Sequence, residues 1–319
     1  MSKIDIKTLV SLVGTKLKHS QELNLELINV EHGKVSLRMP YDPKIVGDIR
    51  TGLLHGGAIT ALMDTCLGCV AISHNEENIL LSPTLDLRMD YIQPAESKDV
   101  IAEGELIRAG KNLAFTRAIA HQGDRNNPIA LCSGNFMQME TNAPDTVVQK
   151  ITGVMTDPAF QLNKDTSQQA LNSFDNTEDC MAALKQCRES GDISQLLACI
   201  PYANTLGINR ISMGDEKVYC MAYKESLMGN PLLPALHGGA ISGFMELSAA
   251  LHVMVEGEVE RVPKIIDFSI DFLRAGKLEE TYALCQVVRQ GRKIVNVAVT
   301  AWQANREMPI ATARCHFLL

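Results

Sequence analysis

Two kinds of hydrophobic pattern alternate along the chain, and both occur twice in the same order. The segments at 55–74 and 237–255 are apolar on more than one face, which predicts two buried helices. Alternating apolar and polar positions, as in Lys34–Met39, instead predict strands. In the first copy we expect further strands at 80–92, 100–107, 114–121 and 130–139. Shorter helices are expected ahead of each copy, over 4–18 and over 179–190 and 193–200.

The sequence itself repeats within this pattern. Leu-His-Gly-Gly-Ala-Ile stands at residues 54–59 and again at 236–241, and each copy has an acid nine positions after its His, Asp64 and Glu246. The hexapeptides are 182 positions apart, and three later pairs of segments keep an offset of 181: 86–95 with 267–276, 108–111 with 289–292, and 128–130 with 309–311. A period this long indicates duplication of one fold, because the units of repeat arrays are far shorter.

The order of elements predicts the fold class. One helix followed by consecutive strands is typical of an α+β fold with an antiparallel sheet. Gly110 and Gly291 stand where hairpin turns would join two of these strands. We expect a first domain over 1–140, a polar linker over 141–176 and a second domain over 177–319. Two copies side by side would pair their sheet edges and bury both long helices against each other.

Composition narrows the class of protein further. With 46% hydrophobic and 21% charged residues in 319, the chain is expected to form a folded core. A net charge of −7 argues against a nucleic-acid partner. Nine scattered Cys residues without a signal peptide predict reduced thiols and a cytoplasmic protein. No stretch is expected to approach the ~20 apolar residues of a membrane span, so we expect no such span.

The repeated motif resembles a known family. His-Gly-Gly-Ala-Ile, the acid nine places after the His, and the later segment with Asp86, Tyr91 and Pro94-Ala95 are similar to the hotdog fold, and more narrowly to PaaI-like acyl-CoA thioesterases of the 4-hydroxybenzoyl-CoA thioesterase superfamily. Members of that family usually form dimers of single hotdogs, so the resemblance implies a dimer fused into one chain. It implies an acyl-CoA substrate and no metal or other cofactor, and it leaves open a homo-oligomer of such tandem chains.

The chemistry of thioester hydrolysis assigns roles to the repeat. Backbone N–H groups of Gly56-Gly57 or Gly238-Gly239, at helix starts, can hold the negative charge that develops on the carbonyl oxygen. Asp64 or Glu246 would activate water or attack the carbonyl directly. Eight residues of helix span about 12 Å, too far for the glycines and acid of one copy to act together.

Antiparallel packing of the two long helices would solve this problem of distance. It predicts two composite sites, one made by Gly238 and Gly239 with Asp64, and the other made by Gly56 and Gly57 with Glu246. Sites shared across the dimer interface are also what the family resemblance implies.

The resemblance also implies that these sites are unequal. Family members often carry a hydroxyl at the position of Thr84, whose counterpart is Ile265, and an Asn ahead of the His, for which Asn230 and Asp48 are the nearest candidates. The Asp64 site would therefore gain Thr84 and Asn230. The Glu246 site would gain Asp48, whose charge is expected to raise the pKa of a neighbouring carboxyl. We predict that the Asp64 site is the competent one.

Other residues have both a functional and a structural interpretation. His55 and His237 could contact the substrate or act as bases, but capping of a helix is the favoured role. Arg50 and Arg292 could meet coenzyme A phosphates, although solvated turns are favoured for both.

Two further alternatives concern the acids and the function as a whole. Asp64 and Glu246 could simply be paired buried acids, but the repeated offset from Gly-Gly favours catalysis. A non-catalytic acyl-CoA-binding module is the second candidate function, and a hotdog dehydratase is a weaker third.

Overall fold

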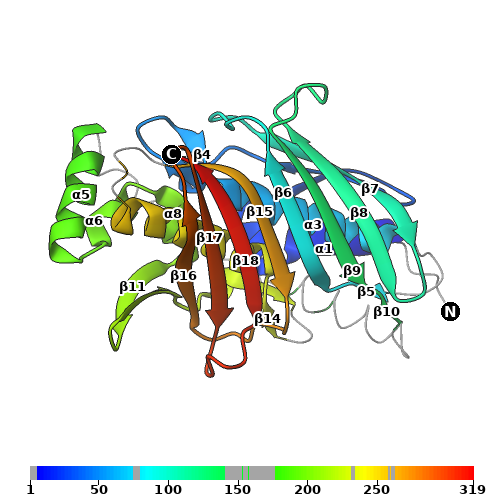
Figure 1. The fold of residues 1–319 in the computed structure, drawn as a ribbon. Coiled ribbons are helices and arrows are strands. Elements are labelled where there is room, and N and C mark those ends of the chain that lie inside the picture. Colours follow the sequence, from blue (N-terminus) through cyan, green and yellow to red (C-terminus); the bar gives the residue numbers. More distant parts are fainter. Residues whose placement is uncertain are drawn as a thin grey trace.

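A computed structural model gives the fold of the chain (Figure 1). The structure describes residues 6–74, 80–140, 177–230, 234–257 and 263–319, together with residues 153, 157 and 259. The expected linker over 141–176 lies outside the described residues, apart from residues 153 and 157.

One antiparallel sheet of twelve strands runs through both halves of the molecule (Figure 1). In spatial order its strands are β1 (Glu26–Glu31), β2 (Lys34–Met39), β7 (Val100–Ala109), β8 (Leu113–His121), β9 (Ala130–Met137), β6 (Thr84–Tyr91), β15 (Lys264–Phe272), β18 (Ala311–Leu318), β17 (Ile294–Trp302), β16 (Thr281–Gln290), β12 (Glu216–Met221) and β11 (Ile208–Met213). The second six strands repeat the order of the first six in reverse, as two hotdogs joined at one edge require.

The junction between the halves is the pair β6 and β15. Asp86 lies opposite Asp271, and Asp90 lies opposite Asp267. At the centre Arg88 faces Ser269, its counterpart 181 positions later in the repeat. The register is therefore symmetric about that central pair, so a pseudo-two-fold axis passes between the domains. The prediction that the copies pair their sheet edges is confirmed.

Each half wraps its sheet around one long helix, α3 (Gly56–Ser73) or α8 (Gly238–Glu256). Both are buried over nearly their whole length, since one side packs on the sheet and the other on the partner helix. Close approaches set their direction: a Cβ built on Gly57 would lie 2.8 Å from Gly243 Cα, and one on Gly239 would lie 2.6 Å from Ala61 Cα. The start of each helix meets the middle of the other, which makes the pair antiparallel.

The helices ahead of each hotdog differ between the halves. The first half has α1 (Ile6–Lys16) and α2 (Lys18–Glu22), and α1 packs on α3. The second half has three: α5 (Thr177–Ser190), α6 (Ser194–Ala198) and α7 (Pro201–Leu206), the last of which the sequence pattern did not predict. Figure 1 shows α5 standing at the outer end of the second half, beyond α6.

Short ribbons and single turns make up most of the remaining described elements. Their bounds are η1 (Pro43–Ile45), β3 (Val46–Asp48), β4 (Leu53–Leu54), β5 (Leu80–Leu81), β10 (Met139–Glu140), η4 (Glu225–Leu227), β13 (Met228–Asn230) and β14 (Ala235–Leu236). The ribbons β3–β4 and β13–β14 end immediately before α3 and α8. The hairpin turns at Gly110 and Gly291 are confirmed by bonds to Leu113 O and Ile294 O, both 2.8 Å.

One expectation about the long helices is wrong. By length and composition alone, α3 and α8 are apolar enough to cross a membrane, contrary to our expectation that no stretch approaches that limit. Nearly all residues of both helices are buried inside the protein. Their composition is therefore explained by a position between a sheet and another helix.

Candidate active sites at the starts of the two central helices

The first composite site joins Asp64 of α3 to the start of α8. Asp64 is 4% exposed, and its Oδ2 would lie 2.8 Å from a Cβ built on Gly238. Only glycine allows the helix start to approach the carboxylate this closely. Thr84, at the start of β6, donates from Oγ1 to Asp64 Oδ1 at 2.8 Å. Thus the structure brings together Asp64, Thr84, Gly238 and Gly239 from three different elements.

Burial and hydrogen bonding act in opposite directions on the Asp64 carboxyl. Burial is the larger effect and raises its pKa to about 6, while the Thr84 hydroxyl and the Gly239 N–H lower the pKa. A carboxyl with a pKa near 6 is roughly 90% ionised at pH 7. Asp64 is therefore a buried base that is still ionised at neutral pH.

The second composite site joins Glu246 of α8 to the start of α3. Here a Cβ on Gly56 would clash with Glu246 Oε1, so the glycine again permits the contact. Tyr91 donates to Glu246 Oε2 at 2.6 Å, and the hydroxyl of Thr60 lies 2.6 Å from that of Tyr91 and 3.4 Å from Oε2. Two hydroxyls therefore occupy one oxygen of this carboxyl.

The pKa of Glu246 is raised further, to about 8, and burial is the largest cause. The hydroxyls of Tyr91 and Thr60 and the N–H of Gly57 lower the pKa but do not offset burial. Glu246 is therefore roughly 10% ionised at pH 7. The charge of Asp48 was expected to raise the pKa of Glu246, and this prediction is wrong. Burial is the main cause of the raised pKa. Asp48 instead accepts hydrogen bonds from Arg50 at 2.8 Å.

Both histidines of the motif cap the helix that follows. His55 Nδ1 accepts the N–H of Gly57, and His237 Nδ1 accepts that of Gly239, each at 2.9 Å. Burial lowers the pKa of His55 to about 3 and that of His237 to about 4, so both rings are neutral at pH 7. This geometry supports the capping role. It also commits the N–H of the second glycine, so the first glycine carries the N–H at the helix start that has no intrahelical acceptor.

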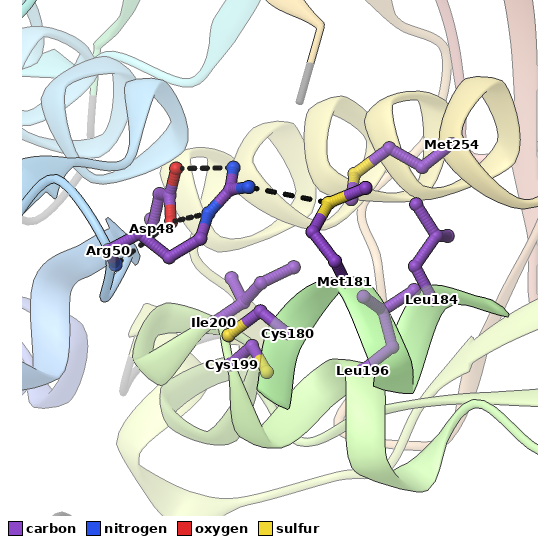
Figure 2. A pocket seen from close by; sticks show the side chains of 10 residues that line it. Asp48, Arg50, Cys180, Met181, Leu184, Leu196, Cys199, Ile200 and Met254 are labelled. Carbon is purple, nitrogen blue, oxygen red and sulfur yellow. Dashed lines mark hydrogen bonds and ion pairs between the residues drawn. The ribbon is translucent and has the colours of Figure 1, made fainter. Parts of the chain in front are cut away.

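The predicted coenzyme A contacts lie away from both carboxyls. Arg50 forms a two-pronged pair with Asp48, and both line a pocket that neither Asp64 nor Glu246 lines (Figure 2). Its guanidinium also reaches Met181 Sδ at 3.5 Å. Arg292 is exposed in the turn between β16 and β17. The Asn230 side chain lies outside the described residues, although its backbone pairs with Ala235. A substrate contact for any of these residues stays a prediction.

Sequence reasoning missed the hydroxyls around Glu246. Tyr91 belongs to the motif, but its role as a partner of Glu246 follows only from the packing of α8 on α3, which brings Glu246 to the start of α3 where Tyr91 lies. The available signal was the comparison of copies, because Tyr91 aligns with Phe272 and Thr60 with Ser242. Phe272 lies against Gly238 as Tyr91 lies against Gly56, so the same position supplies a ring to one site and a ring with a hydroxyl to the other.

Comparisons with known proteins decide the family. The profile of the Thioesterase superfamily matches residues 51–129 and 233–310, one segment in each half. The medium/long-chain acyl-CoA thioesterase YigI of Salmonella typhimurium is 32% identical over 118 residues, which cover 33% of this chain and 76% of that protein. The chain belongs to the thioesterase superfamily.

Other members of the thioesterase superfamily extend the comparison. YigI of Escherichia coli is 30% identical over the same length and covers the same shares of both chains. A putative thioesterase from Novosphingobium aromaticivorans has a TM-score of 0.57 at 12% identity, covering 92% of this chain and 98% of its own. A tesB protein of Mycobacterium avium has a TM-score of 0.56 at 11% identity, covering 97% and 98%. These two structures share the fold, which confirms the tandem hotdog architecture.

Proposed function

We propose that this superfamily member is an acyl-CoA thioesterase that hydrolyses its substrate at the Asp64 site. The observation that carries the proposal is an ionised carboxylate placed against a helix start and oriented by the Thr84 hydroxyl. The relatives named as medium/long-chain acyl-CoA thioesterases support acyl-CoAs of that length as substrates.

The proposed reaction uses the two ends of this arrangement. Asp64 takes a proton from water, and the water oxygen attacks the thioester carbonyl carbon. The N–H of Gly238 stabilises the negative carbonyl oxygen, an effect worth about 3–4 kcal/mol in other enzymes. The carbon–sulfur bond then breaks, and the thiolate of coenzyme A takes the proton from Asp64. Direct attack by Asp64 on the carbonyl carbon is the alternative route; it breaks the carbon–sulfur bond, releases the coenzyme A thiolate and leaves an anhydride between Asp64 and the acyl group. Water that opens this anhydride at the Asp64 carbonyl places its oxygen in the carboxylate, so ¹⁸O in Asp64 after a single turnover in labelled water would identify this route.

The Glu246 site favours the second candidate function, acyl-CoA binding without hydrolysis. A carboxyl that is mostly protonated at pH 7 is a poor base, and hydroxyls already fill one of its oxygens. We infer that this site contributes little to turnover at neutral pH.

Release of free thiol from acyl-CoAs of increasing chain length tests this proposal. We expect Asp64→Asn to lower kcat at least 100-fold, the usual scale for loss of a general base. The matched variant Glu246→Gln should stay within about threefold of the wild type. Loss of turnover in Glu246→Gln alone would reverse the assignment of the sites. Tight binding of acyl-CoA without thiol release by the wild-type protein would favour the binding function.

A further inference from the structure

We propose that Phe272 is a positioning residue for hydrolysis at the Asp64 site, because its ring fills the place of a tyrosine without donating a hydrogen bond to the Asp64 carboxylate. One carboxylate oxygen is thereby left to accept the proton of the attacking water. Phe272 ends β15 and comes from the half of the chain that does not carry Asp64. This inference rests on the proposed function, because it concerns the base that the function assigns.

The rings of Phe272 and Tyr91 occupy equivalent places at the two sites. The two residues are 181 positions apart, and each ends its strand at the junction of the halves. Phe272 Cζ would lie 3.3 Å from a Cβ built on Gly238, and Tyr91 Cζ would lie 3.1 Å from one built on Gly56. The Cβ on Gly238 would also lie 2.8 Å from Asp64 Oδ2. A hydroxyl added to Phe272 Cζ is therefore expected beside Asp64, as the Tyr91 hydroxyl lies beside the acid of its own site.

The Glu246 site shows what a hydroxyl at this place does. Tyr91 donates to Glu246 Oε2 at 2.6 Å. Burial raises the pKa of Glu246, and among the effects that lower this pKa the bond from Tyr91 is the largest. Burial also raises the pKa of Tyr91 well above its usual value, so the phenol keeps its proton at neutral pH. A permanent donor weakens a carboxylate as a base and competes with water for its oxygen.

At the Asp64 site the hydroxyl comes from a different strand and binds only one oxygen. Thr84 of β6 donates to Oδ1, and no side chain within the described part of the protein donates to Oδ2. His237 Nδ1 lies 3.5 Å from Oδ2, but it accepts the N–H of Gly239 and carries no proton. The Phe272 ring has no donor to offer. We therefore assign the proton of the attacking water to Oδ2.

The other titratable groups around Asp64 carry no charge near pH 7. Burial lowers the pKa of His237, at the start of α8, to about 4. Burial raises the pKa of the thiols of Cys69 in α3 and Cys132 in β9 well above the usual value. None of these three groups changes its charge between pH 5 and 7. A lower pKa of Asp64 in a variant would therefore report a new hydrogen bond to the carboxylate.

Phe272→Tyr tests the proposal, because this substitution adds only the hydroxyl. We expect kcat to fall roughly tenfold, since the base becomes weaker and one of its oxygens is shared. The acidic inflection of the kcat profile should move from near pH 6 to about pH 5 or below. The matched control Phe115→Tyr adds the same hydroxyl to a ring of β8 that is 41% exposed, and it should change neither quantity.

The pKa of Asp64 provides a readout that does not depend on activity. In protein labelled with ¹³C at the aspartate carboxyls, the signal of Asp64 is assigned with Asp64→Asn. Its pKa should be near 6 in the wild type and about 5 or below in Phe272→Tyr. An unchanged pKa in Phe272→Tyr would overturn the proposal, even if kcat were lower, because the ring would then act only through its shape. A lower pKa without any loss of kcat would overturn it as well.

The proposed function and the role of Phe272 fail in distinguishable ways. If the wild type hydrolyses no acyl-CoA, the proposed function fails, and the titration of Asp64 still tests whether a hydroxyl at position 272 reaches the carboxylate. If the wild type hydrolyses acyl-CoA and Phe272→Tyr keeps both its kcat and its pH profile, only the role of Phe272 fails.

Discussion

The two composite sites have the same backbone and different chemistry. Each has a histidine cap, a pair of glycines at a helix start, and an acid from the facing helix. At one site the acid is Asp64, held by Thr84, with a pKa raised to about 6. At the other it is Glu246, held by Tyr91 and Thr60, with a pKa raised to about 8.

This difference shows that the repeated glycines define where a site can be, while the surrounding side chains decide whether its acid is ionised. Duplication has kept the features that need a backbone geometry, since a Cβ at Gly56 or Gly238 would meet the opposing acid. It has not kept the residues that hold the acids, as Thr84 and Ile265 or Tyr91 and Phe272 show. The fused dimer can therefore use its two sites differently, which a dimer of identical subunits cannot.

The largest expected difference in turnover between the two sites comes from adding a methyl group at each helix start. In Gly238→Ala the new Cβ would lie 2.8 Å from Asp64 Oδ2 and displace the base from the N–H. We expect kcat/KM to fall about 100-fold, on the scale of losing one oxyanion donor. Gly56→Ala should lower the melting temperature through its clash with Glu246 but keep most of the turnover. Equal losses of kcat/KM in the two variants would contradict the inequality of the sites.

The sequence was sufficient to predict both the duplication and the pairing of the sites. The hexapeptide, the acid nine positions after each His and a helix rise of about 1.5 Å per residue together required antiparallel central helices. The residues that hold the acids were harder to predict. Thr84 followed from the family resemblance, whereas Tyr91 reaches Glu246 because α8 packs on α3 and brings Glu246 to Gly56, against which Tyr91 also lies.

Electrostatics was the least predictable part of the sites. Asp48 stood close in sequence to the expected position of a site residue, and its charge was expected to raise the pKa of Glu246. The structure instead pairs it with Arg50, two positions along the same turn. The degree of burial of Glu246, which is the actual cause, depends on how the two helices and the sheet pack and could not be read from the sequence.

A smaller effect is expected in the pH dependence of stability. Burial raises the pKa of Glu246 from the ordinary glutamate value of 4.5 to about 8 in the folded protein, so the folded chain binds a proton more tightly than the unfolded chain. Its contribution to stability is full below pH 4.5 and is lost as the pH rises through 8. Glu246→Gln removes this loss. The difference in melting temperature, variant minus wild type, should therefore be roughly 5 °C larger at pH 9 than at pH 5. Parallel melting curves across this range would contradict the raised pKa.

The pH dependence of kcat/KM for the wild type and for Glu246→Gln tests the central claim most directly, because the two acids have different pKa values. Activity that requires ionised Asp64 should rise with pH through an inflection near 6, and Glu246→Gln should leave that inflection in place. An inflection near 8 that disappears in Glu246→Gln would show that Glu246 is the base and would contradict the account.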